Sequence, residues 1–244
     1  MTGTKVTSSQ ARRAAAAAEK AERARVERQR RSRRRAVRLL AGMLLIAAIG
    51  VAVQAQRGSP QGGSSTPAGL DAGTGFAIGA ASAPVTVEVY EDFLCPACKH
   101  FEDLSGPTLA SLVKDNQVRV VYRVIAILDR ASTTDYSTRA MNAAACVGTS
   151  GFEAFHQALY AAQPAEGSAG LSDSRLTELA RDAGADGQVA GCISGREYGH
   201  WVASATDEAS RRGVSSTPTV RVNGSPLRSW APADLLAAVE AARR

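Results

Sequence analysis

Apolar and polar side chains alternate over residues 85–90 (Val-Thr-Val-Glu-Val-Tyr). This period of two predicts a half-buried β-strand. A longer run rich in β-branched residues, 118–127, predicts a second buried strand, and residues 76–78 predict a short edge strand. Between the two longer strands, residues 96–104 predict a helix with Pro96 in its first turn, where a backbone N–H is not needed. These segments predict a β-α-β unit.

A helical block extends from about residue 132 to residue 212, because apolar positions recur there at helical spacing between Gly, Pro and Ser breaks. After it, residues 219–227 predict a β-hairpin that turns at Asn223-Gly224, and a final helix begins near Pro232. The order β-α-β, helical block, β-β-α predicts an α/β protein. This order is that of a thioredoxin fold, and we expect a helical insertion between its βαβ and ββα halves.

Positive charge is concentrated at the N-terminus. Residues 1–38 carry 13 Lys or Arg against 3 Asp or Glu, whereas the remainder carries 16 against 20. The net charge of +6 therefore does not argue for a nucleic-acid-binding domain. Residues 39–53 contain no charge, and with their neighbours they approach the ~20 residues that span a bilayer. Because the basic residues lie on one side of this segment only, we expect a cytoplasmic N-terminus.

The chain is therefore expected to have four parts, and the protein to be a single-pass protein of the cell membrane. The parts are a basic cytoplasmic tail (1–35), a transmembrane signal anchor (36–55), a flexible linker rich in Gly, Ser, Pro and Gln (56–74), and an extracytoplasmic thioredoxin-like domain (75–244) with its insertion at about 132–212. A signal peptide cleaved after Val53-Gln54-Ala55 is the alternative, but the long basic segment favours an uncleaved anchor. The tail could also bind nucleic acid or acidic lipid. Its Ala/Arg/Glu monotony favours a topogenic segment, so we expect no nucleic-acid partner.

The candidate chemistry is the C-x-x-C pair Cys95 and Cys98, which follows the first long strand. Cys95 lies at a helix N-terminus, where free N–H groups and the positive end of the helix dipole favour a thiolate. Cys98 is close enough to form a small disulfide ring with it. This arrangement is typical of thiol–disulfide exchange. In the cytosol the same pair would favour metal binding, but an exported chain favours redox chemistry. We therefore expect no metal and no bound cofactor other than the redox-active disulfide.

Three features together resemble the DsbA-like thiol–disulfide oxidoreductases, particularly the membrane-anchored actinobacterial type. They are the sequence Tyr-Glu-Asp-Phe-Leu-Cys-Pro-Ala-Cys at 90–98, the helical block, and Val-Ser-Ser-Thr-Pro-Thr-Val at 214–220. The resemblance implies a cis bond before Pro218, beside the sulfurs, and a Thr217 backbone that pairs with an extended substrate. From sequence alone, an ordinary trans loop is the alternative. The residues expected to shape the site are Pro96, Ala97, Asp92 and Phe93, with Asp92 accepting hydrogen bonds from loop N–H groups.

Two departures from the family pattern matter for the chemistry. Ala97 stands where the best-known oxidases have a histidine, so it supplies neither a hydrogen bond nor a charge to the thiolate. Many relatives also have a buried acid six residues before the first cysteine, and that position is Val89 here. Glu88 and Glu91 flank it, and strand alternation turns Glu88 to the opposite face. The proton acceptor for Cys98 is therefore unassigned.

The other two cysteines, Cys146 and Cys192, both lie in the helical block. A structural disulfide between them is favoured, because neither has a C-x-x-C neighbour and relatives with a second bridge exist. Two free thiols or a second redox pair are the alternatives. His100 could tune the site but is expected on the surface, and His156 and His200 lack metal-ligand spacing, which predicts structural roles.

The sequence thus predicts an extracytoplasmic thiol–disulfide oxidoreductase, of the oxidase type, that forms disulfides in secreted proteins through Cys95 and Cys98. Its expected partners are unfolded, cysteine-containing exported proteins and a membrane re-oxidant similar to vitamin K epoxide reductase or DsbB. The alternatives are a disulfide reductase or isomerase, and a non-catalytic, chaperone-like peptide-binding module.

Overall fold

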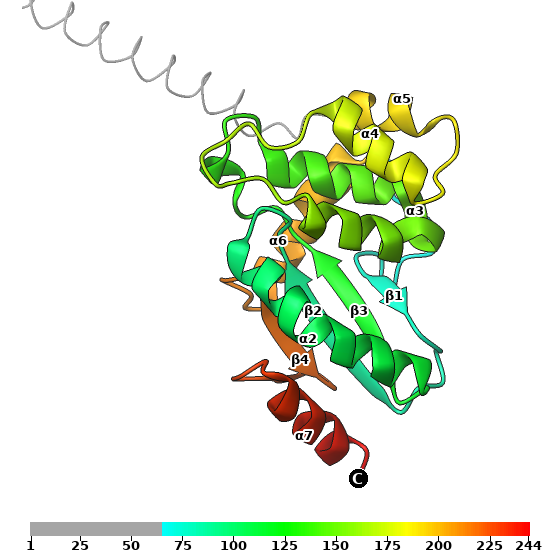
Figure 1. Ribbon diagram of the computed structural model, residues 1–244, viewed down its shortest axis with the longest axis vertical. Helices are drawn as coiled ribbons and strands as arrows, with labels where there is room; N and C mark the ends of the chain where they lie inside the picture. Colours follow the sequence, from blue (N-terminus) through cyan, green and yellow to red (C-terminus); the bar gives the residue numbers. More distant parts are fainter. Residues whose placement is uncertain (1–64) are drawn as a thin grey trace, which may run out of the picture. The chain divides into compact units, whose positions relative to one another are not determined.

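The computed structural model describes residues 65–244 (Figure 1). The predicted tail (1–35), the predicted anchor (36–55) and the linker up to residue 64 lie outside the described residues. Within residues 65–244, no helix is both long and apolar enough to cross a membrane. The strands are β1 (Phe76–Ile78), β2 (Val85–Glu91), β3 (Val118–Val124), β4 (Thr219–Val222) and β5 (Ser225–Pro226). The helices are α2 (Pro96–Lys114), the 3-10 turn η1 (Asp129–Ala131), α3 (Tyr136–Ala161), α4 (Asp173–Asp182), α5 (Val189–Gly195), α6 (Gly199–Arg211) and α7 (Pro232–Ala242).

A five-stranded sheet with the order β1-β3-β2-β4-β5 forms the centre of the domain. β2 and β3 pair in parallel along their whole length, with α2 as the crossover helix that parallel strands require. β4 runs antiparallel on the other side of β2, and its first residue, Thr219, lies opposite Tyr90 near the end of β2. The segment after β2, which carries the cysteine pair, therefore emerges beside the loop that leads into β4. The thioredoxin fold with a helical insertion is confirmed.

Helices cover both faces of the sheet, with α2 and α7 on one face and α6 behind it (Figure 1). Val85, Val87 and Val89 of β2 are fully buried in the main hydrophobic core, which also contains side chains of α2 and α7. The Tyr90 side chain points to the opposite face of the sheet. It packs with Ile125 in a second, smaller core that includes a residue of α6. The alternation along β2 thus separates two cores.

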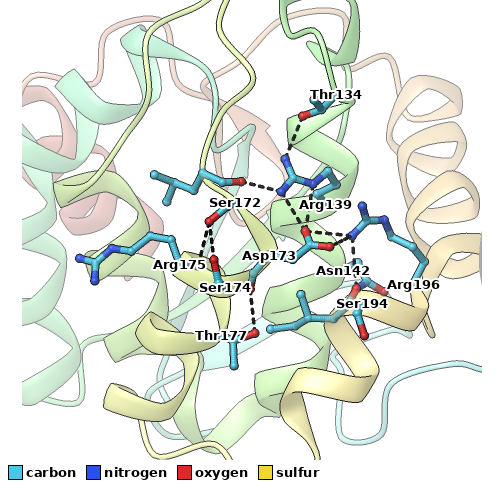
Figure 2. Close-up of polar contacts among 12 residues, drawn as sticks. Thr134, Arg139, Asn142, Ser172, Asp173, Ser174, Arg175, Thr177, Ser194 and Arg196 are labelled. Atoms are coloured by element: carbon cyan, nitrogen blue, oxygen red, sulfur yellow. Dashed lines mark hydrogen bonds and ion pairs between the residues drawn. The ribbon is translucent and has the colours of Figure 1, made fainter.

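The helical insertion is held together by a network of charged groups (Figure 2). Arg139 of α3 contacts Asp173 of α4 at 2.8 Å, and Arg196, after α5, contacts the same carboxylate at 3.3 Å. Arg139 also donates to the carbonyl of Leu171 at 2.6 Å. The Arg139 side chain is largely buried, and a buried charge is tolerated only when it is paired and hydrogen-bonded. The network therefore fixes three helices to one another.

Cys146 of α3 and Cys192 of α5 form a disulfide, with their Cα atoms 5.9 Å apart. Asn142, one turn before Cys146, accepts a hydrogen bond from the N–H of Tyr198 at 2.9 Å. The bridge and this amide contact attach α5 and the chain after it to α3. The structural bridge favoured by the sequence is present.

α2 is longer than predicted, since it continues past Leu104 to Lys114. It passes through Pro107, which lacks the N–H that a helix interior uses and normally kinks or ends a helix. The helix continues because Leu109 and Leu112 bury their side chains in the core under this second half. Tertiary packing therefore outweighs the local preference of the proline.

The chain joins the folded domain earlier than the predicted linker boundary at residue 74. Asp71 contacts Arg119 of β3 at 2.7 Å, and the indole N–H of Trp201 donates to the carbonyl of Gly73 at 2.8 Å. These last residues of the predicted linker therefore pack on the sheet and on α6.

Replacing both bridge cysteines with alanine is expected to lower the free energy of unfolding by about 4 kcal/mol, because the bridge closes a loop of 46 positions in the unfolded chain. Urea unfolding of the full-length Cys146→Ala/Cys192→Ala variant measures this loss. Exchange at Cys95, assayed with glutathione where the variant is folded, should keep its rate. A stability equal to that of the unaltered chain, or a folded variant without exchange, would contradict a purely structural bridge.

Candidate active site

Cys95 is the N-cap residue of α2, and Pro96 occupies the first position of the helix. The Cys95 carbonyl accepts the N–H of Cys98 at 3.1 Å and the N–H of Lys99 at 3.2 Å, which starts the helix. The backbone N–H groups of Ala97 and Cys98, in the first turn, also contribute to lowering the pKa of Cys95. The start of the helix therefore favours negative charge on this sulfur.

The two sulfurs have different environments. Hydrogen bonds, first from the Cys98 thiol and then from Thr217 and the N–H groups of the first turn, lower the pKa of Cys95 to about 6, although partial burial opposes the shift. Burial raises the pKa of Cys98 well above its usual range. Cys95 is 6% exposed and Cys98 is 0% exposed. Cys95 is therefore the sulfur that an external thiol can reach, and Cys98 stays protonated behind it.

The loop before β4 lies directly against Cys95. The Thr217–Pro218 peptide bond is cis, as the motif predicts. When Cys95 is protonated, its thiol donates to the Thr217 carbonyl at 3.4 Å, across 122 positions of sequence. Within residues 65–244, the N–H of Thr217 donates no hydrogen bond to another group of the protein. The loop thus presents an unused backbone donor next to the reactive sulfur, as the edge of a sheet does for a peptide.

Asp92 holds the turn between β2 and α2 in place. Its Oδ1 accepts the N–H of Leu94 at 2.9 Å and the hydroxyl of Ser137 at 2.6 Å. Its Oδ2 accepts the N–H groups of Ile127 and Leu128, both at 2.9 Å. Burial raises the pKa of Asp92 to about 6, although these hydrogen bonds favour the ionised carboxylate. The contacts to loop N–H groups follow the sequence prediction, whereas the contact to α3 was not predicted.

Phe93 and the carbonyls around it are fixed by the end of α3. The Phe93 ring is fully buried, with ring centroids 5.8 Å from His156 and 5.5 Å from Tyr160. Just after α3, the side-chain amide of Gln163 donates to the carbonyls of Phe93 and Cys95, both at 3.0 Å. Gln163 is a positioning residue that the sequence did not reveal, because nothing local distinguishes it from any other polar residue at the end of a helix.

A buried carboxyl, Glu91, lies at the end of β2. It is 0% exposed, and its Oε2 is 2.7 Å from Nε2 of His156. Burial raises the pKa of Glu91 to about 8 and that of the neighbouring Glu102 to about 9, and burial lowers the pKa of His156. The charge of Glu91 also contributes to the raised pKa of Cys98. A buried carboxyl with such a pKa is suited to proton exchange near neutral pH.

These positions add to two sequence expectations. His156 is buried, as expected of a structural residue, and its Nε2 contacts the Glu91 carboxyl. Glu91 shares the strand parity of Val89 and therefore points into the same core, whereas Glu88 pairs with Arg123 at 2.7 Å. The signal in the sequence was the alternation along the strand, which places Glu91 on the same face as Val89.

The remaining predicted residues lie at the surface of the site. Ala97 is exposed, and its methyl group offers no hydrogen bond. His100 is also exposed, with its ring 5.7 Å from that of Trp230. His200 is exposed on α6. Among these residues, only the backbone N–H of Ala97 acts on the reactive sulfur.

Two substitutions of Cys98 test the origin of the low pKa. Cys98→Ser keeps an O–H donor beside Cys95, whereas Cys98→Ala removes the donor that contributes most to the shift. Because a hydrogen bond to a charged group contributes about 1.5–3 kcal/mol, the alanine variant should have a Cys95 pKa roughly 1–2 units higher than the serine variant. The rate of iodoacetamide alkylation against pH measures both values, and in the unaltered reduced protein it should rise through pH 6. Equal values in the two variants would contradict the assigned cause.

Asp92→Asn tests the carboxylate at the centre of the turn. The variant keeps one acceptor oxygen but turns an NH₂ group toward donors that Asp92 now satisfies. Unpaired buried donors cost about 1–3 kcal/mol each, so the free energy of unfolding should fall by about 2–4 kcal/mol in urea. Asp103→Asn, on the exposed side of α2, should change it by less than about 0.5 kcal/mol. A loss in Asp92→Asn no larger than in this control would show that the carboxylate does not hold the turn.

Comparison with known proteins agrees with this geometry. Residues 71–241 match the model of a protein family described as thioredoxin. Among curated proteins, the chain is similar to the serine/threonine-protein kinase PknE of Mycobacterium tuberculosis, with 32% identity over 142 residues that make up 54% of this chain and 25% of the kinase. The chain therefore spans about a quarter of the length of the curated relatives that it matches.

This chain matches several solved structures over most of the length of those structures. Reduced DsbA from Mycobacterium tuberculosis is 35% identical with a TM-score of 0.61, and the match covers 70% of this chain and 98% of that one. The reduced disulfide bond oxidoreductase DsbG from the same organism is 37% identical with a TM-score of 0.63, covering 70% and 88%. The chain thus belongs to the thioredoxin family and, within it, to the DsbA-like thiol–disulfide oxidoreductases.

Proposed function

We propose that this protein is an extracytoplasmic disulfide oxidase that introduces disulfides into newly exported proteins through Cys95 and Cys98. The observation that carries the proposal is the contrast between the two sulfurs, one ionised and reachable and the other buried and protonated. A pKa of about 6 leaves roughly nine tenths of Cys95 as thiolate at pH 7. A stable thiolate is a good leaving group, so the disulfide is readily given up to a substrate.

The direction of the effect follows from the pKa of Cys95. Because this pKa is lower than the roughly 8.5 of an ordinary thiol, ionisation favours the reduced protein at pH values above about 6. The advantage grows up to about pH 8.5, where an ordinary thiol ionises as well, and it disappears as the pH falls through 6. At neutral pH the electrons of a substrate dithiol are therefore drawn to this protein.

The reaction consists of two exchanges. A substrate thiolate attacks the Cys95 sulfur of the Cys95–Cys98 disulfide, so that a mixed disulfide forms and Cys98 leaves with the electron pair and takes up a proton. A second substrate thiolate then attacks the substrate sulfur of the mixed disulfide and releases Cys95 as a thiolate. The substrate loses two electrons and gains a disulfide, and the protein becomes the dithiol.

Backbone groups next to the sulfur suit an unfolded client. The N–H and the carbonyl of Thr217 can pair with one extended segment of the client. Ile127, whose N–H is bound by Asp92, is 39% exposed and adds apolar surface beside the same turn. Backbone pairing next to a small apolar patch favours unfolded chains of many sequences over one defined partner.

Location and re-oxidation are part of the proposal and are supported by the sequence. The apolar segment 36–55 with its one-sided basic flank would tether the domain on the outer side of the membrane. There, a quinone-linked membrane partner similar to vitamin K epoxide reductase or DsbB would return the dithiol to the disulfide. The disulfide itself carries the electrons, so we expect no other cofactor.

An isomerase or reductase is the second candidate, and Ala97 favours it. A side chain without charge or hydrogen bond between the cysteines leaves the thiolate less stabilised than a histidine would. The similarity to DsbG, described as a disulfide bond oxidoreductase, is compatible with either direction. A non-catalytic peptide-binding module is the third, and Cys95→Ser separates it from an enzyme. We expect this variant to lose exchange while it still binds peptide, whereas unchanged function of the variant in client folding would favour the module.

The experiment that decides the direction is the redox equilibrium of the full-length protein. The Cys95–Cys98 couple is equilibrated against graded glutathione buffers and trapped by alkylation, with the Cys146→Ala/Cys192→Ala variant as control for signal from the second pair. We expect a potential well above the roughly −270 mV of thioredoxin. A potential as low as that of thioredoxin would overturn the oxidase proposal in favour of a reductase.

A further inference from the structure

We propose that Glu91, Glu102 and His156 form a binding site for one divalent transition-metal ion, with Zn²⁺ as its best representative. The three side chains come from the end of β2, from α2 and from α3. Each offers one ligand atom, and the three atoms lie within 4.8 Å of one another. Segments far apart in the sequence thus bring two carboxylates and an imidazole to a single point.

The cluster contains acceptor atoms that the protein leaves unused. Glu91 is completely buried, and within residues 65–244 neither its Oε1 nor the buried Oε1 of Glu102 meets an N–H or O–H donor, so these two oxygens can hydrogen-bond only to each other, by sharing a proton. Buried carboxylate oxygens are rarely left without a partner, because losing water without compensation is costly. A cation between the side chains would satisfy both oxygens at once.

A cavity gives an ion access to the cluster. It has a volume of about 560 Å³ and lies between α2 and α3, with Glu102 and His156 in its wall. Asp103 and Glu153 also line it, as do Lys99 and Lys114. Lys99 forms an ion pair with Asp103 at 3.2 Å, and the charges of Glu153 and Lys114 offset each other. The wall of the cavity is therefore close to neutral when Glu102 and His156 are left out of the count. A small hydrated cation can therefore reach Glu102 and His156 without crossing a positive barrier.

The donor set selects among metals. Zn²⁺ binds imidazole nitrogen and carboxylate oxygen at about 2.0–2.2 Å, which places neighbouring ligand atoms of a tetrahedron roughly 3.4 Å apart. The three ligand atoms lie within 4.8 Å of one another, which accommodates this spacing, and a metal bound to Nε2 of His156 would replace its 2.7 Å hydrogen bond to Glu91. Ca²⁺ and Mg²⁺ prefer sites made only of oxygen, and the absence of a thiolate disfavours Cu(I). Three protein ligands leave a fourth position for water.

This site is distinct from the cysteine pair, for which we expect no metal. A reduced C-x-x-C pair can itself bind Zn²⁺, so binding by the dithiol form would not separate the two sites. In the disulfide form the sulfurs of Cys95 and Cys98 are no longer ligands, whereas the carboxylates and the imidazole are unchanged. The oxidised protein is therefore the form that tests the proposal.

The experiment is a calorimetric titration of the oxidised, full-length protein, prepared without a histidine tag, with Zn²⁺. We expect one equivalent to bind. Glu102→Gln and His156→Gln should each weaken binding by more than about tenfold, since even supporting residues of metal sites have effects of about 10–100-fold. Glu153→Gln, in the wall of the same cavity, is the matched control and should bind within about twofold of the unaltered protein.

Two readouts do not depend on the variants folding. Zn²⁺ should raise the melting temperature of the oxidised, unaltered protein, because a ligand that binds only the folded state stabilises it. Co²⁺ in place of Zn²⁺ should give visible absorption without a thiolate charge-transfer band. No binding by the oxidised protein would overturn the proposal and leave a shared proton as the charge that neutralises the carboxyl pair. Equal affinity in folded Glu102→Gln, or a thiolate band, would overturn it as well.

Discussion

The carboxylate of Asp92 is the contact on which the geometry of the site depends. One side chain, without exposed surface, accepts hydrogen bonds from the turn that leads into α2, from the segment after β3 and from α3. Each of these segments has backbone or hydroxyl donors that the sheet cannot satisfy, because β2 and β3 end there. The position of Cys95 at the start of α2 is therefore set by a buried ionisable group that no substrate contacts.

Close to Asp92, the two cysteines are only three positions apart in the sequence but differ in how deeply their sulfurs are buried. The same first turn of α2 helps to lower the pKa of one cysteine and places the other in the core. Glu91 adds a carboxyl on the inner side, while Thr217 and the cis-proline face the outer side. The reactive pair therefore lies between an internal polar cluster and an open backbone edge, and each side affects a different sulfur.

The sequence was sufficient for features that are local. Alternation in β2 and β3, the C-x-x-C pair after a strand, and the Thr-Pro motif before β4 each specify their own conformation within a few residues. It was insufficient where packing at long range decides. α2 passes through Pro107 because later leucines are buried, and Gln163 reaches Cys95 only because α3 ends beside it. Glu91 and His156 are 65 positions apart in the sequence, so only the folded chain brings them into contact. The alternation of side chains along β2 nevertheless indicated that Glu91 faces the core.

The separation of 122 positions between Cys95 and Thr217 has a consequence for the order of events during synthesis. A chain made from its N-terminus contains both cysteines of the pair and the whole of α2 well before β4 exists. The β-α-β unit can form first, but the backbone edge at Thr217, to which we propose that a client binds, is added only when the last 28 residues arrive and β4 pairs with β2. During that interval the nascent protein has its reactive thiols but lacks the backbone edge at Thr217. Cys146 and Cys192 are then the other cysteines of the chain that have already been synthesised.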